Sequence, residues 1–417
     1  MTNPIFTKEN WLRALTFATV IVCVFSSKAA VPLLLLFGLS LVWCVGLGSL
    51  RLSLLPRAAS IGLAALVLWS LVGAVWSAAP VTVLKTNWPL PLLIAAGLVT
   101  VGLAARLEKT HSDAITSALM AGMVVALCLV VLEAATYNWI GRQLRGLEWP
   151  DIINFETGGE SLTGLIKAPI AILCLLIWPV MARWMAAGNK LIPLALYVAL
   201  IASAAWFDAT TAMLVLVAGG VLVALGRWNL RVITRLFAAA ALILIVAMPL
   251  LVRPITSTGF LMAADSGKTS IPIPVSGISR LHIWQFVSEK VSERPWTGWG
   301  LKSSRYVEGA DQKYTVIRQD AQGREAILYK DFNLPLHPHN QALQIWLELG
   351  LIGALIAGLT AFAVIWRGAE RAGSLGLGLI AGILIFDLLS FGAWQNWWIA
   401  AQFLAISYLV NVKRKPS

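Results

Sequence analysis

Twelve long apolar runs constrain the fold of this chain more than any other feature of its sequence. A helix needs about 20 apolar residues to cross the hydrocarbon core of a bilayer. Separating apolar stretches at charged residues, Pro and Gly predicts spans at approximately 11–26, 30–49, 58–77, 88–105, 113–137, 164–185, 191–207, 209–226, 232–252, 340–366, 373–393 and 395–411. Of the 417 residues, 59% are hydrophobic and only 12% are charged, which leaves too little polar surface for a water-soluble globular protein. The sequence therefore predicts an all-α polytopic membrane protein with about twelve transmembrane helices.

The distribution of Lys and Arg over the connections predicts how the spans face. When the short connections are numbered alternately, one set contains most of these residues, and the opposite set contains only Lys28 and Lys85. Because positively charged loops stay in the cytoplasm, both termini are predicted to be cytoplasmic. The net charge of +12 would suggest nucleic acid in a soluble domain. Here it is interpreted as a topology signal, and no nucleic-acid partner is predicted.

Two long connections fall on the predicted outer side, at about 138–163 and 253–339. Loops of this length in a compact protein are usually functional or disordered. The larger loop is rich in Trp, Pro, Gly and interspersed charge, so we expect it to be folded, with a short amphipathic helix around 280–292. The chain then divides into helices 1–9 within 1–252, the large loop between helices 9 and 10, and helices 10–12 with a cytoplasmic tail within 340–417.

Two imidazoles stand directly before the tenth predicted span. His337 and His339 precede Asn340, and Asn is a preferred N-cap residue that can open this helix at the outer face. The N-terminus of a helix favours anions, and His can accept a proton from a hydroxyl near neutral pH. From the spacing alone, a solvated turn is an equally good interpretation of the His-Pro-His segment.

Arg280, further upstream, offers a planar guanidinium suited to phosphate oxygens, although a lone Arg on an amphipathic helix is more often a surface residue. Gly298 and Gly300 allow the backbone a tight turn. The sequence contains no Walker motif, zinc-ligand spacing, Gly-x-Ser-x-Gly motif or dinucleotide fingerprint. The four cysteines all lie inside apolar runs and are predicted to be core residues. We therefore predict neither a metal site nor a cofactor.

Ionisable residues also occur within the spans or at their rims, where they are costly and often functional. They are Glu133, Lys167, Asp208, Glu348 and Asp387. Lys167 and Asp208 are expected near the outer ends of their helices, within reach of the same face as His339. Glu348 is expected about 13 Å deeper than His339 along its helix, where it would pair with a neighbouring helix. Glu133 and Asp387 are interpreted as structural partners or as protonated acids.

As an ordered set, these motifs resemble the O-antigen ligase family, which includes O-antigen polymerases and protein O-oligosaccharyltransferases. The pattern is Arg-x-x-x-Trp, then Pro-x-x-Gly-x-Gly, then His-x-His-Asn before a span with Glu-x-Gly-x-x-Gly. It falls here on Arg280 and Trp284; Pro295, Gly298 and Gly300; His337, His339 and Asn340; and Glu348, Gly350 and Gly353. The resemblance covers about residues 203–366, and the layout of twelve spans with a large late loop agrees over the whole chain. The motifs do not separate ligase from polymerase.

The resemblance implies a metal-independent glycosyl transfer at the periplasmic face of the bacterial inner membrane, without a cofactor. The donor would be a glycan on undecaprenyl pyrophosphate, with its polyprenyl tail among the membrane lipids. The acceptor would be a sugar hydroxyl of lipid A-core for a ligase, or of a second lipid-linked repeat for an O-antigen or exopolysaccharide polymerase. By motif position, His339 is the first candidate for the catalytic base and His337 the second, while Arg280 would bind the pyrophosphate.

One position departs from the family pattern. The family often has a Ser-Arg pair at the outer start of the eighth span, whereas this chain has Thr211 at the Arg position. The second cationic contact is then expected from one of four residues, or the activity differs. These candidates are Lys167, Lys85, Arg142 and Arg145. Asn340 completes the predicted substrate-binding set.

Two other classes of function remain as alternatives. A transporter of lipid-linked glycans tends to have inverted repeats and helices broken at the membrane midplane, whereas this sequence shows no internal repeat and gathers its polar residues at one face. A non-catalytic membrane scaffold would tolerate replacement of His339 by Ala, and an enzyme that uses this imidazole would not.

Overall fold

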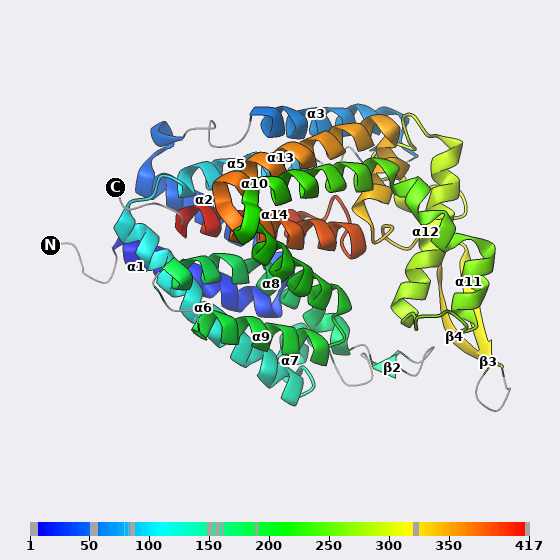
Figure 1. Ribbon diagram of the computed structural model, residues 1–417, viewed down its shortest axis with the longest axis horizontal. Helices are drawn as coiled ribbons and strands as arrows, with labels where there is room; N and C mark the ends of the chain where they lie inside the picture. Colours follow the sequence, from blue (N-terminus) through cyan, green and yellow to red (C-terminus); the bar gives the residue numbers. More distant parts are fainter. Residues whose placement is uncertain are drawn as a thin grey trace.

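The computed structural model describes residues 7–50, 57–78, 80–81, 83, 88–147, 153–154, 159–160, 162–186, 188, 191–319 and 325–412. Most of them are helical (Figure 1). The helices are α1 (Lys8–Phe25), α2 (Ala30–Val45), α3 (Arg57–Gly73), α5 (Pro89–Ala104), α6 (Lys109–Ala135), α7 (Trp139–Arg145), α8 (Leu162–Ala186), α9 (Leu191–Trp206), α10 (Thr210–Val252), α11 (Thr258–Asp265), α12 (Val275–Glu293), α13 (Gln341–Leu389) and α14 (Asn396–Val412). Two antiparallel pairs of strands accompany them: β1 (Ile153–Asn154) with β2 (Gly159–Glu160), and β3 (Lys313–Gln319) with β4 (Glu325–Phe332).

Each of the twelve predicted apolar runs is helical. The runs at 209–226 and 232–252 both lie in α10, which has a non-helical residue at Asn229. Helix α13 contains the run at 340–366 from Gln341 on and the run at 373–393 only as far as Leu389, and it is interrupted at Gly373. Six helices in the described part are long and apolar enough to cross a membrane. The chain is therefore a mostly helical, polytopic membrane protein, and the number of twelve spans stays a prediction.

The predicted span at 340–366 differs from the structure in one respect. It is not a continuous helix, because Gly350 has φ 65° and ψ −165°. The residues on both sides of Gly350 are apolar leucines, so the hydropathy pattern contains no sign of the interruption. Contacts from a distant loop explain it, as described below.

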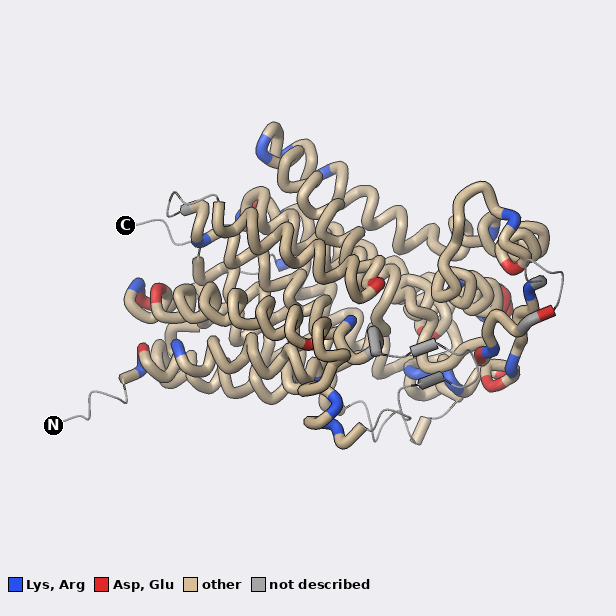
Figure 2. The backbone as a smooth tube through the Cα atoms, turned by 90° about the horizontal axis from the view of Figure 1, so that it is seen from below, with Lys and Arg blue, Asp and Glu red and all other residues tan. Residues whose placement is uncertain are grey.

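The bundle has two distinct ends. The start of α1 and the end of α14 lie at one end, and α11, α12 and the β3–β4 hairpin lie at the other (Figure 1). Lys, Arg, Asp and Glu gather towards both ends, while the middle of the bundle carries few of them (Figure 2). This distribution suits a bilayer, in which charged side chains are costly near the centre and acceptable at the surfaces.

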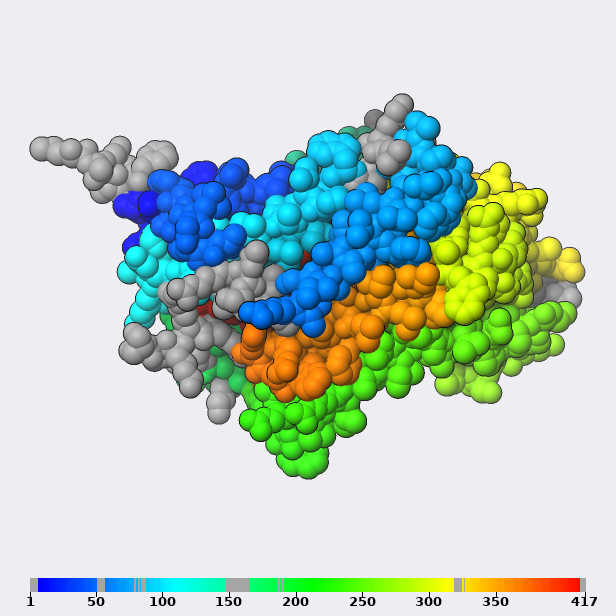
Figure 3. Space-filling view, turned by 90° about the horizontal axis from the view of Figure 1, so that it is seen from above, coloured from blue at the N-terminus to red at the C-terminus, as the bar shows by residue number. Residues whose placement is uncertain are grey.

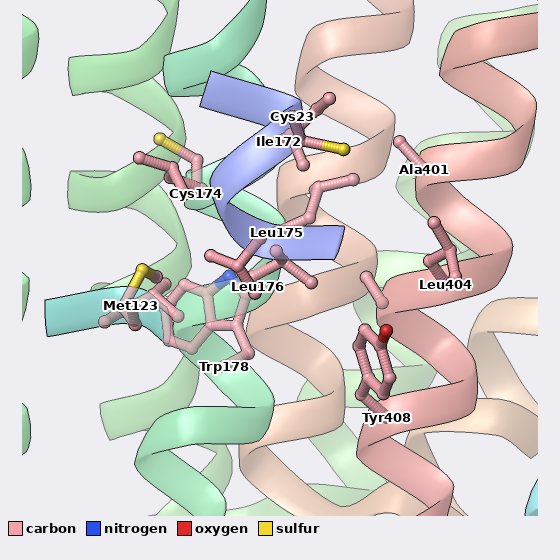
Figure 4. Close-up of a cluster of buried hydrophobic side chains, with 14 of the residues drawn as sticks. Cys23, Met123, Ile172, Cys174, Leu175, Leu176, Trp178, Ala401, Leu404 and Tyr408 are labelled. Atoms are coloured by element: carbon pink, nitrogen blue, oxygen red, sulfur yellow. The ribbon is translucent and has the colours of Figure 1, made fainter. Parts of the chain in front are cut away.

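The main hydrophobic core surrounds α8. Ile172, Leu175 and Trp178 of α8 are buried with Leu404 and Tyr408 of α14 (Figure 4). A side chain that packs in the core and one that faces lipid have the same hydropathy, so the sequence alone does not separate them.

The cysteines illustrate this ambiguity. Cys23 and Cys174 are buried in the main core, as predicted. Cys44 is half-buried and Cys128 is exposed, so the prediction that all four are core residues was wrong for Cys128. All four are free thiols.

The large loop is folded and packs on one end of the bundle. The helix expected around 280–292 is confirmed as α12, which begins earlier, at Val275, and ends at Glu293. Its buried side chains belong to a second hydrophobic cluster that continues into α10 and α13. In Figure 3, α3 lies along α13, and the large loop caps the end of both.

The smaller loop begins with α7, whose first turn is capped by an acidic residue of α6. Glu133 is buried and accepts hydrogen bonds from the backbone N–H groups of Ile140 (3.0 Å) and Gly141 (2.9 Å). A carboxylate is favourable at a helix N-terminus, where N–H groups have no partner within the helix. The structural role predicted for Glu133 is therefore confirmed.

Candidate active site

The break at Gly350 is filled by the backbone of the loop at 295–300, which joins α12 to the rest of the large loop. A break in a helix leaves carbonyl and N–H groups without partners, and these are costly in a membrane protein unless another segment satisfies them. Here the two segments exchange hydrogen bonds: Trp299 N to Leu347 O (2.8 Å), Gly300 N to Glu348 O (2.9 Å), Leu351 N to Pro295 O (2.8 Å) and Ile352 N to Trp296 O (3.4 Å). The indole of Trp69 donates to Leu349 O (3.0 Å).

Close approach of backbones explains three glycines of the sequence motifs: Gly298 and Gly350 where this loop meets α13, and Gly300 where the same loop meets the backbone of Ser77. Gly298, Gly300 and Gly350 all have positive φ, which favours glycine. A Cβ on Gly350 would lie 2.3 Å from the carbonyl carbon of Trp296. A Cβ on Gly298 would lie 2.5 Å from the carbonyl carbon of Glu348. The glycines thus let two backbones touch, a requirement more specific than the tight turn expected from the sequence.

Glu348, directly before the break, holds three segments together. Its side chain is fully buried and accepts four hydrogen bonds: from Lys302 N (2.6 Å), Ser304 Oγ (2.5 Å), Gln344 Nε2 (3.0 Å) and Trp394 Nε1 (2.6 Å). The expected pairing with a neighbouring helix is therefore wrong. Glu348 binds the large loop, its own helix and the connection between α13 and α14.

The Arg-x-x-x-Trp motif places two side chains on one face of α12, because residues four apart lie one above the other on a helix. The Trp284 indole donates to the carbonyl of Pro338 (2.9 Å) and so fixes the His-Pro-His segment to α12. Arg280 is half-buried and within electrostatic reach of His339. Burial lowers the pKa of Arg280, although a guanidinium stays charged. It has no hydrogen bond or ion pair to any residue in the described part of the chain.

The His-Pro-His segment ends in the helix cap that the sequence predicts. The Asn340 side chain accepts a hydrogen bond from Leu343 N (3.0 Å) and opens α13. His339 has φ 54°, an uncommon conformation for a residue other than glycine. Its backbone N–H donates to Nδ1 of His337 (3.1 Å), and the two ring centroids are 4.5 Å apart. The segment is thus an ordered pair of imidazoles and not a solvated turn.

The surroundings of His339 select one tautomer. Its Nδ1 is 2.9 Å from the carbonyl oxygen of Ser390, which can only accept, so Nδ1 carries the proton in the neutral ring. Nε2 then holds a lone pair, and it has no hydrogen-bond partner among the described residues. Burial lowers the pKa of His339; the bond to Ser390 opposes this shift and the Arg280 charge adds to it. The ring is therefore neutral near pH 7, with Nε2 available as an acceptor.

His337 differs, because both of its nitrogens are engaged. Nδ1 accepts from the His339 backbone, and Nε2 is 2.9 Å from the amide nitrogen of Gln395. Rotating that amide by 180° places Oε1, which otherwise has no partner among the described residues, against the Nε2–H of His337. Burial, followed by the charges of His339 and Arg305, lowers the pKa of His337 to about 3. His337 is thus neutral and held in place.

The connection between α13 and α14 supplies residues that the sequence analysis missed. Ser390, Trp394 and Gln395 hold the imidazoles and Glu348, as described above. A Cβ on Gly392 would lie 2.9 Å from the ring of His337. The predicted spans at 373–393 and 395–411 include Ser390 and Gln395, so the hydropathy pattern contains no signal for this connection.

Of the four candidates for the second cation, Lys167 is the one that the structure places near Arg280. It lies near the start of α8, is exposed, and is within electrostatic reach of both Arg280 and Asp208. Asp208 has φ 48° and lies between α9 and α10. Thr211, the position that departs from the family pattern, is the second residue of α10. The structure thus relates Lys167 to Asp208 and Arg280, and the reach of Lys167 and Asp208 to the face of His339 stays a prediction.

Two of the other candidates, Arg142 and Arg145, are not brought to this place. Arg142 and Arg145 lie on α7, at the edge of the bundle away from α12 (Figure 1). Arg142 donates to the carbonyl of Tyr137 (3.1 Å), and Arg145 donates to that of Phe25 (2.8 Å). Lys85 lies outside the described residues.

The remaining buried acid, Asp387, has a structural environment. It accepts hydrogen bonds from Gln341 (2.8 Å), Trp398 (2.7 Å) and Gln402 (3.3 Å), in agreement with the structural role expected from the sequence. Within the described ranges, no group of three or more His, Cys, Asp or Glu side chains could hold a metal ion. Independence from metals stays a prediction.

Comparison with known proteins identifies the domain that contains most of this site. Residues 195–358 match the family model of O-antigen ligases, and this range includes Arg280, both imidazoles and the break at Gly350. This similarity to O-antigen ligases covers about two fifths of the chain. The resemblance drawn from the sequence motifs is thereby confirmed.

Relatives of the chain extend beyond the O-antigen ligase domain. A protein of Rickettsia conorii named "putative polysaccharide ligase" is 25% identical over 292 residues, which are 68% of this chain and 63% of that protein. A protein of Rickettsia bellii with the same name is 25% identical over 307 residues, covering 72% of this chain and 67% of the relative. The chain thus spans slightly less than two thirds of the first relative, and the activity of the whole protein is a proposal.

Proposed function

We propose that this protein is a membrane glycosyltransferase that moves a glycan from a lipid-linked diphosphate to a sugar hydroxyl. One observation carries the proposal: a neutral His339 is within electrostatic reach of Arg280, and among the described residues neither its Nε2 nor the guanidinium has a partner. A transfer of this kind needs a group that accepts a proton and a group that receives negative charge. The two side chains have these two properties.

His339 acts as the base in the proposed reaction. The acceptor hydroxyl gives its proton to Nε2 of His339 while its oxygen forms a bond to C1 of the donor sugar. The Nδ1–H···O bond to Ser390 stabilises the imidazolium that results, because a carbonyl accepts more strongly from a charged donor. A general base in position contributes about 10²- to 10⁴-fold to the rate.

Arg280 and Lys167 receive the leaving group. The bond between C1 and the phosphate oxygen breaks, and the diphosphate leaves with the electron pair. Cationic groups that are in place before the reaction stabilise this growing charge without rearranging. The position of Lys167 within reach of Arg280 supports it as the substitute for the arginine that Thr211 replaces. Asn340 contributes by fixing the histidine segment at the helix cap, rather than through its side-chain oxygen, which is already occupied.

The proposed setting is the periplasmic face of a bacterial inner membrane, with twelve spans and both termini in the cytoplasm. Two observations support it: the asymmetry of Lys and Arg over the short connections, and the position of the large loop at the end of the bundle opposite the start of α1 and the end of α14. The donor would then be a glycan on undecaprenyl pyrophosphate.

The acceptor distinguishes two forms of the proposal. A ligase would use lipid A-core, and a polymerase would use a second lipid-linked repeat. Purified protein is incubated with lipid-linked glycan and each acceptor in turn, and the products are separated by mobility. Elongation of only one acceptor assigns the reaction.

The same assay tests the site. We expect His339→Ala and Arg280→Ala each to reduce transfer by at least about 100-fold, while both proteins accumulate in the membrane. His111→Ala and Arg253→Ala serve as matched controls, since His111 lies on α6 and Arg253 is exposed at the end of α10. Transfer retained by both site variants would contradict the proposal that this protein is a glycosyltransferase.

A further inference from the structure

A cavity of about 330 Å³ adjoins His337, between residues of the large loop and the connection from α13 to α14. Its wall includes Lys302, Arg305, Tyr306 and Trp394, and it does not include Arg280. Its volume lies at the lower end of the range of small-molecule sites, which is about 300–1,000 Å³. The O-antigen ligase motifs do not account for this cavity, because Arg305, Tyr306 and Trp394 are outside them.

The cavity offers a charge to a ligand. Arg305 is exposed and has no hydrogen bond or ion pair to another residue within the described ranges. The carboxylate in the wall belongs to Glu348, whose oxygens already accept four hydrogen bonds from the protein. A ligand therefore meets a guanidinium that is ready to bind and a carboxylate that is already occupied. Guanidinium groups prefer planar anionic partners such as phosphate and carboxylate.

The cavity also offers surfaces suited to a sugar ring. Tyr306 is 49% exposed, and Trp394 lines the wall while its indole nitrogen is bonded to Glu348. Gln344 and Gln395 add amide groups beside these aromatic rings. Aromatic faces with a few placed polar groups are typical of small-molecule sites.

The position of the cavity relates it to the base. His337 lines the cavity, and its ring centroid is 4.5 Å from that of His339. His339 in turn is within electrostatic reach of Arg280. The two imidazoles thus lie between two separate cationic places, Arg280 with Lys167 on one side and Arg305 with Lys302 on the other.

We propose that this cavity is the subsite for the acceptor sugar, and that Arg305 selects an acceptor that carries an anionic group, a phosphate or a carboxylate. The proposal rests on the proposed glycosyl transfer, since it assigns the second substrate of that reaction. A sugar in the cavity would lie against His337 and present a hydroxyl towards Nε2 of His339. The donor diphosphate would approach from the side of Arg280.

A binding experiment tests the cavity independently of any reaction. The purified protein in phosphatidylcholine nanodiscs is titrated with glucose 6-phosphate and with glucose, and binding is followed by saturation-transfer NMR. Binding of inorganic phosphate, which has no non-exchangeable proton, is measured by its displacement of glucose 6-phosphate. We expect glucose 6-phosphate to bind about tenfold more tightly than either of the other two. Arg305→Gln should remove the preference over glucose, and the matched exposed-arginine variant Arg253→Gln should keep it. A preference that survives in Arg305→Gln, or no preference in the native protein, overturns the proposal.

Two further measurements identify the source of the anionic group and show whether Arg305 acts on the acceptor or on the donor. Addition of phosphatidylglycerol to the nanodiscs should not displace glucose 6-phosphate; displacement would assign the cavity to a lipid headgroup and overturn the proposal. In the transfer assay with a phosphorylated acceptor, Arg305→Gln should raise the acceptor KM about tenfold at unchanged donor KM, and Arg305→Lys should restore part of the loss. A change in donor KM instead would contradict an acceptor site. If even the native protein transfers nothing, the proposed function fails, while the binding result still decides on the cavity.

Discussion

The long helix α13 is interrupted by glycine twice, and the two interruptions have nearly the same backbone torsions. Gly350 has φ 65° and ψ −165°, and Gly373 has φ 66° and ψ −169°. Their surroundings differ. Gly373 is half-buried and follows Arg367, Glu370 and Arg371 at the boundary of two predicted spans. Gly350 is buried between leucines, and a loop 50 residues earlier in the chain supplies partners for its neighbours.

The difference shows that one local conformation serves two purposes. At Gly373 the chain ends one predicted span and begins the next, and charged residues mark the position. At Gly350 the helix stays within the protein and receives the backbone of another segment. Only the second break organises a site, because Glu348, directly before it, binds the large loop and the α13–α14 connection together.

The largest expected effect comes from adding a methyl group at each break. Gly350→Ala should lower the free energy of unfolding by about 3–5 kcal/mol, because its Cβ would lie 2.3 Å from the Trp296 carbonyl carbon in addition to the strain of positive φ. Gly373→Ala should cost about 1–3 kcal/mol, the strain of this backbone conformation in a residue with a Cβ. Unfolding of both variants in detergent, followed by circular dichroism against denaturant, measures the difference. Equal losses of stability in the two variants would mean that the packing of the loop at 295–300 does not depend on the break at Gly350.

A smaller effect is expected from the acid beside each break. Glu348→Gln replaces one accepting oxygen by an NH₂ group that faces protein donors, so it should destabilise the protein by about 2–3 kcal/mol. Glu370→Gln, near Gly373, should cost at most about 1 kcal/mol, since Glu370 is half-buried and near solvent. The same unfolding measurement applies, with transfer activity as a second readout. Glu348→Gln with native stability would show that the four hydrogen bonds contribute little.

The smallest effect concerns pH and separates the two imidazoles. Burial lowers the pKa of His339 below its usual 6.5, and the base must be neutral to accept a proton. Transfer should therefore be constant above that value and decrease as the pH falls through the pKa of His339. Initial rates at saturating acceptor from about pH 5 to about pH 8 test this.

Gln395→Leu provides the contrast for that profile. It removes the partner of His337, so it should lower kcat no more than about tenfold and leave the acid limb where it is. An acid limb above pH 6.5, or one that moves in Gln395→Leu, would assign the base to another group.

Much of the fold could be predicted because local patterns determine it. Hydropathy located the helices, Asn340 marked the start of α13, and the four-residue spacing of Arg280 and Trp284 fits one face of α12. The environments of His339 and His337 could not be predicted, because the carbonyl of Ser390 and the amide of Gln395 come from a connection more than 50 residues away. Similarly, Arg142 and Arg145 of α7 have the charge expected of the second cation, and only their positions in the structure exclude them.

The first segment of α13 works as a spacer of fixed length and phase. It runs from the cap at Asn340 to Gly350, and both of its ends are pinned by hydrogen bonds to other segments. Each residue of an α-helix advances it by about 1.5 Å and turns it by about 100°. Insertion of a single residue into this segment would rotate the imidazole pair by about a quarter turn around the helix axis, away from α12. The site would then be disrupted although all of its side chains were still present in the sequence.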